Sequence, residues 1–88
     1  MIRNANFMLQ DVAGTQVIVP VGEAVVAFPG MITVNGTGAY IWQLLEQEQS
    51  VESLAKAIVE RYEVTEERAT ADVKAFVAQL RPTGALVD

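Results

Sequence analysis

The sequence predicts an α+β domain in which three short strands precede three helices. In the first half, β-branched runs are separated by prolines and glycines, and only one residue of each of these two types lies after residue 38. In the second half, the apolar residues follow a helical period instead. Strands followed by helices are typical of α+β folds. The 88 residues fit one domain, residues 1–88.

The first two strands are expected at residues 7–12 and 15–19. Both runs are rich in apolar and β-branched residues, and Ala13-Gly14 between them is a turn signal. Pro20 ends the second run, because proline has no N–H to donate to a strand ladder. The two runs therefore predict the start of an antiparallel meander.

The third strand is expected at Met31–Asn35, immediately before the first helix. Residues 24–28 (AVVAF) are also apolar, but Pro29-Gly30 follows them, so they form either a fourth short strand or part of a wide connection. If Met31–Asn35 is the last strand of the sheet, one of its edges has unpaired N–H and C=O groups. An edge strand beside a helix is an arrangement that captures extended peptides.

Three helices are expected after the strands. The first covers residues 39–45, with Asn35 or Thr37 as its N-cap. Ser50 is a suitable N-cap for the second helix. The third is expected at Thr65–Arg81, and a short turn before it predicts helix-turn-helix geometry. Its apolar stripe has helical spacing and consists of Ala69, Val73, Phe76, Val77 and Leu80.

The composition argues against several classes of function. The chain has no cysteine and no histidine, which removes disulfides, thiolate nucleophiles, the usual zinc sites and an imidazole base. We therefore expect no catalytic residue, no metal site and no cofactor. A net charge of −5 disfavours nucleic acid as a partner. The apolar runs are too short to span a bilayer and no signal peptide is visible, so we expect a cytoplasmic protein without a membrane partner.

Three segments in a fixed order resemble the PqqD-like family. They are GMITVNGTGAYIWQLL, SVESLAKAIVERYEV and ATADVKAFVAQL, and the resemblance covers roughly residues 15–87. The shared features are a strand that ends in Val-Asn, a turn of small residues before Ile-Trp, and the starts of the two helices that follow. Each piece is also a common core pattern, and their order and spacing make the resemblance specific.

The resemblance implies a winged helix-turn-helix-like fold without enzymatic activity. Members of this family are recognition elements for ribosomally synthesised and post-translationally modified peptides. The leader of a precursor peptide is expected to bind as an added antiparallel strand against the last helix. A modifying enzyme, such as a radical SAM enzyme, a protease or a cyclase, is then the second partner. With no fused enzyme domain visible, we expect a stand-alone module.

The family pattern places the peptide-binding residues on the third strand and the last helix. Ile32 and Val34 share one face of the strand and are expected to be core under any interpretation. On the helix, the expected flank carries Arg68, Asp72, Ala75 and Gln79, and Arg68 and Asp72 can also form a simple surface ion pair. The opposite flank (Thr70, Lys74 and Val77) is the alternative. The predicted peptide-binding residues are Met31, Ile32, Thr33, Val34, Arg68, Ala69, Asp72, Val73 and Phe76.

Two other functions fit the same topology. A winged-helix nucleic-acid binder would need basic residues on its recognition helix, whereas the third helix begins with Glu66-Glu67. A protein–protein scaffold could be a monomer or could form a homodimer through the exposed strand edge.

Overall fold

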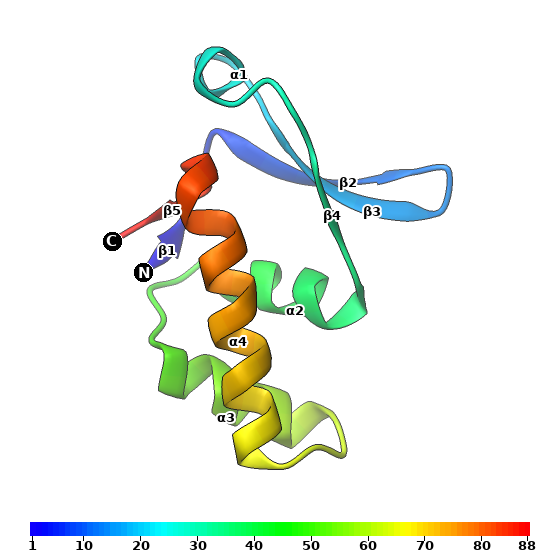
Figure 1. Cartoon of the computed structure of the whole chain (residues 1–88), viewed down its shortest axis with the longest axis vertical. Coiled ribbons are helices and arrows are strands. Elements are labelled where there is room, and N and C mark those ends of the chain that lie inside the picture. Colours follow the sequence, from blue (N-terminus) through cyan, green and yellow to red (C-terminus); the bar gives the residue numbers. More distant parts are fainter.

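The sheet of this protein has three antiparallel strands in the order β2-β3-β4, with β3 in the centre (Figure 1). The computed structural model describes residues 1–88. Strand β2 is Phe7–Val12, β3 is Thr15–Pro20 and β4 is Ile32–Val34. The predicted three-stranded meander is confirmed, and its third strand is shorter than the expected Met31–Asn35.

The turn between β2 and β3 is a two-residue hairpin loop, as the Ala13-Gly14 signal predicts. Both residues have positive φ, 53° for Ala13 and 85° for Gly14, which is the requirement of a type I′ turn. The Asp11 carboxylate accepts a hydrogen bond from the Gly14 N–H at 2.9 Å and holds the loop. This turn fixes the register that pairs Val12 with Thr15.

The connection between β3 and β4 contains a one-turn helix, α1, at Ala24–Ala27 (Figure 1). The alternative of a fourth strand at residues 24–28 is therefore wrong, and the wide connection is the correct one. The backbone bonds locally here, with the Phe28 N–H donating to the Ala24 carbonyl at 2.9 Å. Ala24 and Phe28 pack against the core, whereas Val26 between them is 88% exposed. A strand would place all three side chains on one face, whereas only residues three or four positions apart share a face of a helix, so this burial pattern fits the helical turn.

Three helices follow: α2 at Gly36–Leu44, α3 at Val51–Arg61 and α4 at Glu66–Leu80. The Ser50 hydroxyl caps α3 in a reciprocal capping box with Ser53. The Thr65 hydroxyl caps α4 by accepting from the Arg68 N–H at 3.1 Å. The cap predicted at Ser50 is confirmed, and the third helix begins directly after Thr65. The helical stripe predicted for α4 is buried at every position.

A second, two-stranded antiparallel sheet joins the two ends of the chain. Strand β1 (Ile2–Arg3) pairs with β5 (Leu86–Val87), which follows a 3₁₀ turn, η1, at Arg81–Thr83. The N- and C-termini therefore lie close together (Figure 1). The apolar tail packs on the core as expected, with Ala85 completely buried. The pairing of β1 was not predicted, because a strand of two residues is too short to show an alternating pattern of apolar and polar residues.

The core lies between one face of the sheet and the helices. Ile18 from β3 and Ile32 and Val34 from β4 pack in one cluster with buried residues of α2, α3 and α4, including Trp42 and Leu80. The other face of the sheet does not belong to this core. Met8 and Thr33 lie on that face, since their side chains alternate with those of core residues, and both are exposed. None of the helices has the length and apolar character needed to cross a membrane.

Candidate functional site

Strand β4 is an edge strand with one side unpaired. It pairs with β3 alone, in the register Gln16↔Val34, Val17↔Thr33 and Ile18↔Ile32. On the side away from β3, no strand pairs with β4, and its backbone N–H and C=O groups are available for a further strand. The edge predicted from the sequence is therefore present, and nothing else in the chain pairs with it.

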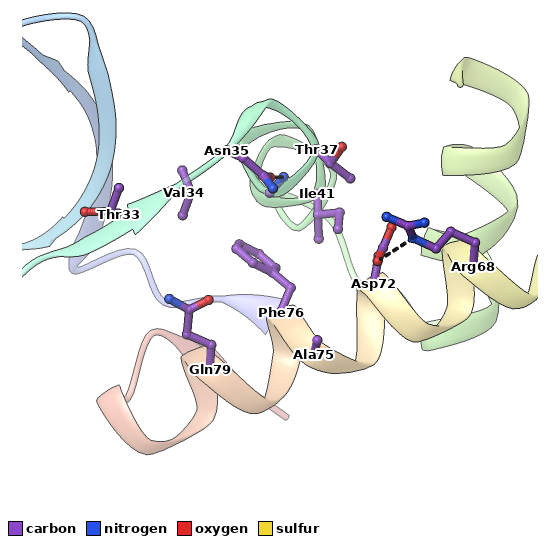
Figure 2. A pocket seen from close by; sticks show the side chains of 11 residues that line it. Thr33, Val34, Asn35, Thr37, Ile41, Arg68, Asp72, Ala75, Phe76 and Gln79 are labelled. Carbon is purple, nitrogen blue, oxygen red and sulfur yellow. Dashed lines mark hydrogen bonds and ion pairs between the residues drawn. The ribbon is translucent and has the colours of Figure 1, made fainter. Parts of the chain in front are cut away.

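A groove of 350 Å³ lies where β4, α2 and α4 come together (Figure 2). Its side chains rise from all three elements, and Phe76 and Gln79 point from α4 toward β4 and the start of α2. The lining residues are Thr33, Val34, Asn35, Thr37, Gly38, Ile41, Arg68, Asp72, Ala75, Phe76 and Gln79.

One flank of α4 forms the wall opposite β4. The α4 residues of the groove recur at intervals of three or four positions, with Ala75 and Phe76 adjacent, so they share one side of the helix: Arg68, Asp72, Ala75, Phe76 and Gln79. This is the flank expected from the sequence. The alternative flank of Thr70, Lys74 and Val77 does not line the groove.

The start of α2 sets the shape of the groove. Asn35 stays extended, with φ −88° and ψ −178°, and its side chain caps the helix by accepting from the Gly38 N–H at 2.8 Å. A Cβ at Gly38 would lie 3.0 Å from the Phe76 ring and 3.3 Å from the Val34 Cβ. The absence of a side chain at this position therefore lets α2 approach α4 closely while Phe76 stays on the groove floor. Helix α2 begins three residues earlier than expected, so Gly36-Thr37-Gly38 is its first turn.

The groove has a charged end and a neutral end. Beside Thr37, the Arg68 Nε lies 3.3 Å from an Asp72 carboxylate oxygen, and the two side chains are 72% and 40% exposed. At the other end, the lining residues Thr33 and Gln79 are uncharged (Figure 2). Because β4 and α4 run in opposite directions along the groove, the charged end lies beside the C-terminal end of β4.

The structure brings five of the predicted site residues together in the groove: Thr33, Val34, Arg68, Asp72 and Phe76. Ile32, Ala69 and Val73 are buried in the core and do not line it. Met31 is 60% exposed and lies outside the lining. Ala75 and Gln79 also line the groove, and they belong to the flank of α4 that was expected from the sequence. The lining residues that the sequence did not indicate are Asn35, Thr37, Gly38 and Ile41.

Some of these lining residues could have been predicted from the sequence. The Asn-Gly-Thr-Gly pattern after the third strand indicates a capped helix start next to the predicted edge, and so predicts that residues 35–38 border it. Ile41 carried no such signal, because an apolar residue on a short helix is equally typical of the core.

Comparisons with known proteins agree with this fold. Two solved structures are similar: a lasso peptide synthetase B1 complexed with the leader peptide, and TbiB1 in complex with the TbiA(beta) leader peptide. The first has 22% identity and a TM-score of 0.73 and covers 98% of this chain and 95% of its own. The second has 19% identity and a TM-score of 0.74 and covers 100% of both chains. These likenesses establish the shared fold.

Among curated proteins, none matches the sequence. A family model described as coenzyme PQQ synthesis protein D (PqqD) matches residues 15–86, which is most of the chain. The protein with the β4 edge and the α4 groove is therefore a member of the PqqD family.

Proposed function

We propose that this protein recognises the leader of a ribosomally synthesised precursor peptide and delivers it to a modifying enzyme. The leader adds to β4 as a fourth antiparallel strand, and its side chains on one face enter the groove against α4. The observation that carries the proposal is that the unpaired edge of β4 lies alongside a groove of 350 Å³. Backbone bonds to the edge supply affinity, and the groove selects side chains.

Membership of the PqqD family supports this proposal, as do the leader peptides in the complexes of both similar structures. In this role, residues 1–88 act as one recognition domain in the cytoplasm, where ribosomal peptides are made, and the chemistry belongs to the partner enzyme. A single added strand makes an interface below the standard size. Affinity beyond that of the backbone bonds therefore depends on a few buried anchor side chains of the peptide.

Nucleic-acid binding has no comparable support. The first turn of α4 carries Glu66 and Glu67, and the chain has a net charge of −5. Both features oppose contact with a phosphate backbone.

The test is a titration of fluorescently labelled peptides, taken from small open reading frames beside this gene, against the protein. Wild type should bind one of them with a Kd on the order of tens of micromolar or tighter. Thr33→Pro should weaken binding because it places a ring without an N–H in β4, whereas Thr33→Val keeps the backbone donor and serves as the control. Circular dichroism would establish that both variants are folded. If wild type binds none of the peptides, the proposal fails.

A further inference from the structure

The face of the sheet that turns away from the helices carries no charged side chain. Side chains alternate along each strand, so the residues between the core positions share this outer face. On β2 they are Met8, Gln10 and Val12; on β3 they are Thr15, Val17 and Val19; on β4 the residue is Thr33. Met8 and Val12 are 49% and 48% exposed, and Met31, which follows the same alternation just before β4, is 60% exposed.

The register arranges these residues in rows across the sheet. Met8 lies opposite Val19, and Val17 lies opposite Thr33. The observed register ends at the pair Ile18↔Ile32, and one further step in the same direction places Met31, just outside β4, opposite Val19. One row is therefore apolar from edge to edge and consists of Met8, Val19 and Met31. The row that ends at Thr33 presents a hydroxyl at the β4 edge instead.

If a peptide adds to β4 as a strand, as the proposed function requires, its side chains extend both rows. Half of the peptide side chains face the groove, and the other half lie on the outer face. We propose that Met31, with Val19 behind it, forms a second peptide subsite on this outer face, which takes one apolar side chain. Cross-strand neighbours on one face contact each other directly, and the flexible thioether of methionine adapts to side chains of different shape.

The antiparallel direction fixes where this side chain lies in the peptide. A peptide residue opposite Thr33 is followed two positions later by the residue opposite Met31, and the residue between them faces the groove side, opposite Ile32. The ligand is therefore an extended segment with groove anchors on alternate residues. It also has one apolar residue of the opposite parity, at the C-terminal end of the bound stretch.

A double-mutant cycle tests this subsite. Peptides of about 12 residues, long enough to pass β4 on both sides, are selected from a random display library on the wild-type protein. A serine scan of one selected peptide is then measured against wild type, Met31→Ser and Met8→Ser. Met8 lies in the same row at the far edge of the sheet and is the matched control.

On wild type, serine at one apolar peptide position should weaken binding about threefold to fivefold. On Met31→Ser, the same peptide substitution should cause no further loss of affinity. That position should lie an odd number of residues from the groove anchors. Met8→Ser should give the wild-type profile. The inference is overturned, and the proposed function survives, if peptides bind but their scans are the same on wild type and Met31→Ser. If no peptide is enriched on wild type, both fail.

Discussion

At the scale of single residues, three positions shape the groove. Asn35 ends β4 and starts α2, Gly38 allows the close approach of α2 to α4, and Phe76 occupies the space that this approach leaves. The apolar stripe of α4 could be predicted from its spacing, and so could the cap at Asn35. The role of Gly38 could not, because it depends on the distance between two helices that are far apart in the sequence.

Gly38→Ala should weaken peptide binding and lower the stability by up to about 2 kcal/mol. The new Cβ would lie 3.0 Å from the Phe76 ring, so the ring must shift toward the groove. Crowding of this kind costs about 1–3 kcal/mol, and the higher helix propensity of alanine offsets up to about 1 kcal/mol of it. Gly36→Ala is the matched control, since its Cβ has no neighbour within 4 Å. Fluorescence titration and thermal melting measure the two effects. Equal affinities for the two variants would contradict this account of Gly38.

Asp72→Asn should change which peptides bind and leave the fold intact. The pair with Arg68 is exposed, and such i, i+4 pairs contribute only about 0.3–0.5 kcal/mol to stability. Without the carboxylate, the charged end of the groove becomes positive. This end receives the N-terminal part of an antiparallel peptide. A peptide with glutamate there should gain affinity up to about fivefold, and its lysine counterpart should lose as much.

The control for this prediction is Asp88→Asn. Asp88 accepts a hydrogen bond from Arg81, which lowers the pKa of its carboxyl, and neither residue lines the groove. This variant should bind both peptides as wild type does. An unchanged preference between the two peptides in Asp72→Asn would show that the Arg68 end does not contact the ligand.

At the scale of elements, the sequence predicted the three strands, the three helices and the flank of α4 that faces β4. These predictions depend on period, caps and turns, which act over a few residues. Two features depend on other information. Residues 24–28 have the composition of a strand, but residues 24–27 form α1 and the segment pairs with no strand. Strands β1 and β5 form only because the two chain ends meet, and a two-residue pairing leaves no pattern in the sequence.

Binding to β4 by strand addition predicts a period of two in the backbone of the ligand. In an antiparallel pair, alternate residues direct their N–H groups toward the partner strand. N-methylation at those positions of a bound peptide should weaken binding by about tenfold or more, because each change removes a donor and places a methyl group against β4. The positions in between should tolerate it. A titration series of singly N-methylated peptides measures this, and equal losses along the peptide would contradict strand addition.

At the scale of the whole molecule, the sheet and α1 form one end and α2, α3 and α4 form the other, with the groove where they meet (Figure 1). The sheet has two edges, at β2 and at β4. Only β4 has the α4 flank beside it, since the groove includes no residue of β2. The account therefore depends on which of the two edges receives the peptide.

Amide hydrogen exchange, followed by NMR with and without a bound peptide, tests this most directly. The account predicts that exchange slows at backbone amides within residues 31–35, while the amides of β2, Phe7–Val12, keep their rates. Slowed exchange along β2 with unchanged rates at β4 would contradict it.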